Sequence, residues 1–175
     1  MPRGRPLRIV VATPTERRII DTLSKILPAA AASYEQCLTD LGGPTRRSYR
    51  GVAHEMREAL RETLDYLAPD SEVMAETGFT LEKGTTRPTQ RQKALHILTK
   101  RRLSREAMRA PELAVSMVDE LGAAITRSTY RRGSISAHGA GSSQEVRQLK
   151  MYVDAVLAEL LEIHAPESRA PSAAG

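Results

Sequence analysis

The chain has 175 residues, with 26 Lys and Arg against 21 Asp and Glu, one Cys and no Trp. This length suits a single domain that folds without a metal or disulfide, and the lone Cys37 excludes an intramolecular disulfide, as is usual in a reducing compartment. No stretch approaches the length of a membrane span or of a signal-peptide apolar region, so we expect a cytoplasmic protein with no membrane partner. The basic balance beside 3% aromatic residues favours contact with phosphate over stacking on bases.

Apolar residues recur at intervals of three and four along most of the chain, which predicts an all-α bundle of about five to seven helices. Thr13 with Glu16, and Thr89 with Gln92, have the spacing of capping boxes at helix starts. The predicted helices are 14–27, 28–41, 48–67, a short one after residue 71, 89–102, a short one from 104, a long one opened at 111, and 142–163.

The segment between the third and fifth of these helices has a weaker pattern. Gly78, Gly84 and Pro88 surround Phe79, which indicates a loop or a minor strand pair near 79–87. The ends of the chain lack periodicity and are rich in Pro, Arg, Ser and Ala. We therefore expect one helical domain over 9–164 between disordered tails at 1–8 and 165–175.

Charge is segregated along the sequence. Residues 54–82 hold eight acids against Arg57 and Arg61, whereas residues 83–110 hold nine bases against Glu106 alone. Of the 26 bases, 21 are Arg, whose guanidinium forks onto phosphate oxygens. A source genome biased towards Arg would explain the excess of bases but not their clustering, and we expect the 83–110 segment to guide a nucleic acid.

The strongest candidate site is the segment 127–138 at the end of the long helix. In helical register, the apolar face of that helix contains Leu113, Met117, Leu121, Ala124 and Ile125. Continuing this register would bring Arg131 and Arg132 onto the same face, and a buried unpaired guanidinium costs several kcal/mol (about 3–5). The pattern predicts that an anion or a second subunit meets these arginines.

His138 follows at the glycine-rich break after the helix. Arg132 as a fixed cation and His138 as a proton carrier are what phosphodiester cleavage needs without a metal. We expect these two to be catalytic, and five further residues to bind substrate: Arg131, Arg127, Ser134, Ser136 and Arg50. The plain alternative is a helix end with favourable C-terminal arginines and an exposed loop histidine.

Metal-dependent chemistry has less support. Asp70, Glu82 and Lys83 partly fit the acid and lysine pattern of restriction-type nucleases, but the acid and Lys are adjacent where that pattern has one residue between them. The histidines at 54, 96, 138 and 164 lack zinc-ligand spacing, and no phosphate-binding glycine loop is present. We expect no metal and no cofactor.

Several of these segments resemble one bacterial family, the predicted pPIWI-associating nuclease. The resemblance runs over roughly residues 15–164, and the segments that carry it are 48–51, 59–62, 67–70, 87–93, 127–138 and 152–163. It implies a nuclease.

The pair of arginines and His138 also resemble the signature of the HEPN superfamily, all-helical ribonucleases of toxin and phage-defence systems. Five residues separate Arg132 from His138 and six separate Arg131 from it, so both arginines fit the motif's spacing. The polar residue usual after the motif's arginine is present after Arg131, whereas Gly133 follows Arg132, so the choice between them stays open, with Arg132 favoured by its register.

The HEPN resemblance implies RNA cleavage without a metal, in which the 2′-hydroxyl attacks the adjacent phosphate, and a homodimer with two motifs facing one cleft. The leading hypothesis is therefore a HEPN-like homodimeric endoribonuclease of a bacterial defence or toxin system, with a defence-system protein or an antitoxin as a further partner. Two alternatives remain: a non-catalytic helical module that binds nucleic acid or a partner protein, and a metal-dependent DNase built on Asp70 and Glu82.

Overall fold

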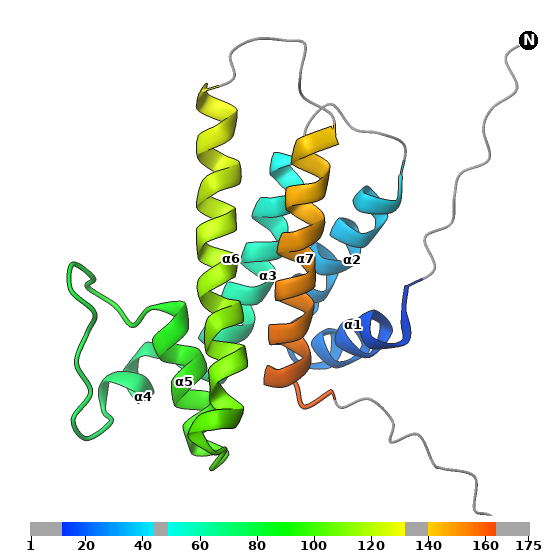
Figure 1. Cartoon of the computed structure of the whole chain (residues 1–175). Coiled ribbons are helices and arrows are strands. Elements are labelled where there is room, and N and C mark those ends of the chain that lie inside the picture. The colour runs from blue at the N-terminus through cyan, green and yellow to red at the C-terminus, as the bar shows by residue number, and fades with distance from the viewer. Residues whose placement is uncertain (1–11, 44–48, 132–139, 164–175) are drawn as a thin grey trace, which may run out of the picture.

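The structure is a computed structural model that describes residues 12–43, 49–131 and 140–163; the side chains of Arg50, 126–131 and 140–142 are not described. These residues form an all-α bundle, as predicted (Figure 1). The helices are α1 (Pro14–Ile26), α2 (Pro28–Gly42), α3 (Arg50–Leu67), α4 (Asp70–Met74), α5 (Gln90–Lys100), α6 (Arg105–Arg131) and α7 (Ala140–Leu160). The predicted tails at 1–8 and 165–175 lie outside the described residues.

Both predicted capping boxes are present. The Thr13 hydroxyl accepts from the Glu16 amide at 3.2 Å, while the Glu16 carboxylate accepts from the Thr13 amide at 2.6 Å. Thr89 and Gln92 form the same reciprocal pair at the start of α5. These bonds satisfy amides that have no partner inside the helix, which is why both helices begin where the sequence predicts.

Of the two alternatives for residues 79–87, the loop is confirmed and the strand pair is wrong. Within the described residues this segment is irregular and has no strand, and its chain turns at the left-handed residues Gly78 (φ 81°) and Gly84 (φ 84°). Side chains hold it in place of a backbone ladder: the Gln92 amide donates to the Thr80 carbonyl at 2.8 Å, and Arg91 pairs with Glu82.

The prediction of two helices separated at Pro111 is also wrong, because α6 runs through that proline. Ser104 does act as a cap, since its hydroxyl accepts from the Ala107 amide at 3.2 Å. Pro111 removes one backbone hydrogen bond near the start of α6. The following turns pack against α3, α5 and α7, which outweighs that local loss. At the other break, α7 begins at Ala140, two residues before the predicted cap Ser142.

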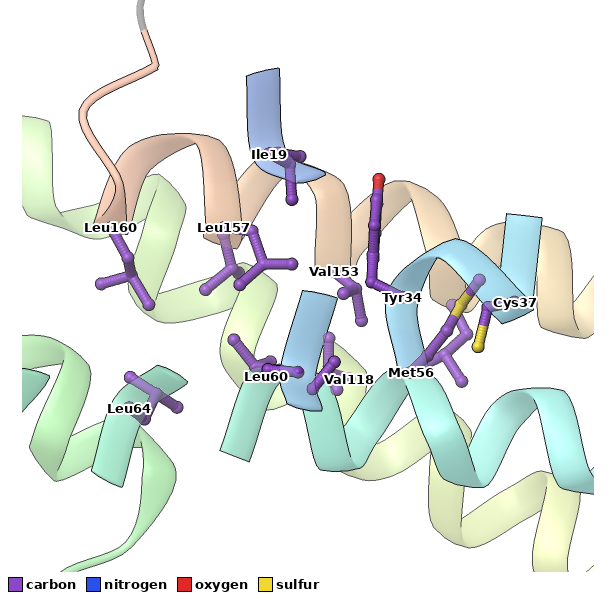
Figure 2. Packing of buried hydrophobic residues seen from close by; sticks show 14 of the residues in the cluster. Ile19, Tyr34, Cys37, Met56, Leu60, Leu64, Val118, Val153, Leu157 and Leu160 are labelled. Atoms are coloured by element: carbon purple, nitrogen blue, oxygen red, sulfur yellow. The ribbon is translucent and has the colours of Figure 1, made fainter. Parts of the chain in front are cut away.

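The long helices α6 and α7 lie antiparallel, with α3 and α2 behind them and α1 crossing near the other end (Figure 1). Their facing sides form one hydrophobic cluster, in which Met56 and Leu60 of α3 meet Val118 of α6 and Leu157 of α7 (Figure 2). Each fully buried side chain of this size contributes about 1.5–3 kcal/mol relative to exposure. The core therefore fixes the relative positions of the helix ends.

A buried polar cluster joins α1 and α2 to α7. The Tyr34 hydroxyl donates to Asp154 Oδ1 at 2.7 Å, and the Lys150 ammonium bonds both Asp154 and Glu16. Burial raises the pKa of Asp154, although Lys150 and Tyr34 act in the opposite direction. Burial also raises the pKa of Tyr34, which keeps its hydroxyl protonated as a donor.

None of the described helices combines the length and apolar character that crossing a membrane requires.

Candidate functional site

Four helix ends lie near one end of the bundle: the last turn of α2, the start of α3, the end of α6 and the start of α7 (Figure 1). The core packing of α3, α6 and α7 brings three of them together. The fourth, the end of α2, is held by a hydrogen bond: Arg147 of α7 donates to the Leu41 carbonyl at 3.0 Å. The antiparallel pair α6 and α7 is connected at this end of the bundle.

Three of the predicted site positions belong to helix ends at this end of the bundle. Arg50 is the first residue of α3, and Arg127 and Arg131 belong to the last turns of α6. The structure thus brings together the helix ends that carry positions 50, 127 and 131. The remaining predicted residues, Arg132, Ser134, Ser136 and His138, lie outside the described residues.

The predicted core face of α6 is correct in part. Ile125 is buried in the core and Leu121 packs against it, as predicted. Leu113 is 62% exposed and Ala124 is also exposed, whereas Val118 is fully buried. The buried side of the first half of α6 therefore differs from the predicted one.

The candidate arginines follow at the end of this helix. Arg131 is the last residue of α6, and its side chain lies outside the described part of the structure. The expectation that an anion or a second subunit meets Arg131 and Arg132 therefore stays a prediction.

The basic segment 83–110 is largely neutralised by the acidic segment before it. Lys93 is 5% exposed and bonds Asp65 at 2.5 Å and Asp70 at 2.6 Å. The other ion pairs of its Lys and Arg residues are Arg87 with Asp70, Arg91 with Glu82 and Glu112, Lys100 with Glu72, and Arg101 with Glu162. These bonds attach α5 to its neighbours. Four exposed bases have no ion pair with a described residue: Lys83, Arg102, Arg105 and Arg109. The expected guiding surface for nucleic acid is therefore smaller than the sequence indicates.

The same pairs occupy the acids of the metal-dependent alternative. Asp70 accepts from Lys93 and Arg87, and the Lys93 ammonium and then the Arg87 guanidinium hold the pKa of Asp70 below its ordinary value. Glu82 accepts two hydrogen bonds from Arg91, at 2.8 and 3.0 Å. In the part of the chain that the structure describes, no group of three or more His, Cys, Asp or Glu is placed to hold a metal.

Two features were missed in the sequence. Lys150 and Asp154 are four residues apart on α7, a spacing typical of surface pairs, so nothing marked them as partly buried. The contact of Arg57 with Gly122 was missed as well; its only signal is a glycine inside a long helix, which often indicates close packing.

The comparisons with known proteins give one family. Residues 23–149 match the family described as predicted pPIWI-associating nuclease, and the match spans most of the chain, from the second half of α1 to the middle of α7. It includes the whole 127–138 segment. No curated protein and no solved structure matches the sequence. The chain belongs to the family of predicted pPIWI-associating nucleases.

Proposed function

We propose that this protein is an endoribonuclease that cleaves the phosphodiester backbone without a metal, using Arg132 and His138. The observation that carries the proposal is the common end of the bundle at which α3 begins, α6 ends and α7 begins. The connection between α6 and α7 contains both Arg132 and His138, and the flanking helix ends supply positions 50, 127 and 131. Membership of a predicted nuclease family supports a nucleic acid as the substrate.

The proposed chemistry uses the RNA's own 2′-hydroxyl as nucleophile. His138 takes the proton from this hydroxyl, or returns one to the leaving 5′-oxygen, because an imidazole has a pKa near neutrality, about 6.5. Arg132 stabilises the negative charge that builds on the phosphoryl oxygens. The products are a 2′,3′-cyclic phosphate and a 5′-hydroxyl. Arg131, Arg127, Arg50, Ser134 and Ser136 position the backbone.

The assembly and setting are part of the proposal. Two copies would place two such sites across one cleft, as the resemblance to HEPN ribonucleases implies. The family's description names association with pPIWI proteins, which supports a role in a bacterial defence or toxin system with a partner protein.

The test uses the full chain with labelled single-stranded RNA in excess chelator. We expect cleavage that leaves cyclic phosphate ends, no cleavage of the matched DNA, and loss of activity in Arg132→Ala and His138→Ala. Arg17→Ala is the matched control, because Arg17 is an exposed base on α1, near the other end of the bundle, and should retain activity. Cleavage that needs Mg²⁺ and survives His138→Ala would overturn the mechanism, and RNA binding without any product would favour the non-catalytic module.

A further inference from the structure

Basic and acidic positions follow separate lines along α3. The four basic positions of the helix are spaced at intervals of four, three and four residues, so they share one line: positions 50, 54, 57 and 61. Three of its acids follow similar intervals on the neighbouring flank: Glu55, Glu58 and Glu62. The basic line begins at the bundle end that carries the candidate site.

Arg57 lies directly against α6 because position 122 is glycine. A Cβ at Gly122 would come within 2.6 Å of Arg57 Nε and still closer to its Cδ, a separation that real Cβ contacts do not show. The glycine costs helix stability, about 1 kcal/mol relative to alanine, so its presence inside α6 needs a packing reason. The side chain of Arg57 supplies one.

The guanidinium of Arg57 has no close hydrogen-bond partner among the described residues. Its Nε is buried and lacks a hydrogen bond to any described residue, and its Nη2 is 3.9 Å from Asp119 Oδ1. That separation is longer than a charge-assisted hydrogen bond, about 2.7–2.9 Å. Since the side chain is 33% exposed while Nε is buried, other atoms of the side chain reach the surface.

Arg61, one turn further along the same line, differs from Arg57 because it has close carboxylate partners. It bonds Glu58 at 2.7 Å and Asp65 at 2.8 Å, so its charge is already matched. Of these two arginines, Arg57 is therefore the one whose guanidinium can still bind an anion.

Helices α3 and α6 run antiparallel (Figure 1). Moving from Arg57 towards Arg50 on α3 therefore means moving from Gly122 towards Arg131 on α6. The seven residues between Arg57 and Arg50 correspond to about 10 Å of helix. Arg57 accordingly lies about two turns from the end of the bundle where the proposed cleavage site lies.

We propose that Arg57 binds a backbone phosphate of the RNA that extends along α3 and α6 from the cleavage site. This inference rests on the proposed function for its substrate. On binding, the guanidinium exchanges its distant carboxylate, Asp119, for a phosphate oxygen. Asp119 then competes with the RNA for Arg57, so removing its charge strengthens binding.

The test measures the affinity of the full-length His138→Ala chain for a labelled single-stranded RNA in excess chelator, over a series of salt concentrations. We expect Arg57→Gln to weaken binding about tenfold and to lower the slope of log K against log salt by about 0.7, the value for one lost phosphate contact. Arg61→Gln removes the same charge from the same helix and should change affinity less than about twofold.

Two further variants separate the contact from the charge. Gly122→Ala keeps every charge but forces Arg57 out of its place; it should weaken binding nearly as much as Arg57→Gln while the melting temperature holds or rises. Asp119→Asn should strengthen binding more than Glu120→Gln, which removes an equal charge from the adjacent, exposed position.

Equal effects of Arg57→Gln and Arg61→Gln, or an unchanged affinity in folded Gly122→Ala, would overturn the inference. These binding results stand apart from catalysis. If the wild-type chain binds RNA through Arg57 but produces no cleavage, the proposed function fails and the phosphate contact stands. If it cleaves RNA while Arg57→Gln binds normally, the proposed function stands and the phosphate contact at Arg57 fails.

Discussion

Replacing Tyr34 by Phe tests the polar cluster that joins α1 and α2 to α7. Tyr34 is fully buried, and its hydroxyl donates to Asp154 at 2.7 Å, so the substitution removes one hydrogen bond to a carboxylate and leaves the ring in place. A hydrogen bond to a charged group contributes about 1.5–3 kcal/mol, and we expect the free energy of unfolding at neutral pH to fall by about 2 kcal/mol. Urea unfolding followed by circular dichroism gives this value directly.

The effect of Tyr34→Phe on the free energy of unfolding should depend on pH in a definite direction. Burial raises the pKa of Asp154, so the stability associated with its neutral form is present at low pH and is lost as the pH rises through that pKa. The Tyr34 hydroxyl favours the charged carboxylate and offsets part of this loss. The cost of Tyr34→Phe should therefore be largest at neutral pH and shrink as the pH falls through the raised pKa of Asp154, above the ordinary aspartate value of about 3.9.

Tyr66→Phe is the matched control, because Tyr66 is exposed on α3 and the same change there should alter stability by less than about 0.5 kcal/mol. A cost below that level for Tyr34→Phe, or a cost that does not change with pH, would refute the reasoning.

Three further predictions concern stability. Lys93→Met should destabilise the protein by about 1–3 kcal/mol at neutral pH, because two carboxylates lose their shared cation. Because the pKa of Asp70 is lowered, this contribution to stability is present above the ordinary pKa of about 3.8 and is lost as the pH falls below it. The free energies of unfolding of the wild type and the variant, measured over a series of acid pH values, should therefore converge. Thr89→Ala should cost about 1 kcal/mol through loss of the α5 cap, measured by thermal unfolding. Leu157→Ala should cost about 2–5 kcal/mol in the same assay, whereas Met151→Ala, on the exposed side of α7, should cost little.

The sequence predicts best those features that depend on neighbours in the chain. The Thr13 and Thr89 caps form between residues three apart, and both helices begin as predicted. Pro111 is also a local signal, but the packing of α6 on three other helices overrides it. The strand pair fails for a related reason: turn glycines alone do not supply the partner strand that a ladder needs.

Long-range pairing accounts for the errors in the candidate site. A charge count identifies the basic segment but not its partners, and Lys93 lies between acids that are 23 and 28 residues earlier in the chain. On α6 the larger apolar residues predict the core face correctly at Leu121 and Ile125 but not at Leu113, where Ala114 and Val118 lie on the buried side instead. The catalytic roles of Arg132 and His138 stay predictions.

The polar cluster of Tyr34 also decides how the chain can be shortened. The family match ends at residue 149, one residue before Lys150, and begins after Glu16. A fragment trimmed to these limits would keep the Tyr34 hydroxyl but lose Lys150 and both carboxylates of the cluster, Asp154 and Glu16. It would also lose the second half of α7, whose Val153, Val156, Leu157 and Leu160 are fully buried. The smallest fragment that retains the complete core therefore extends from Thr13 to beyond Leu160, and the limits of sequence similarity fall inside the packed core.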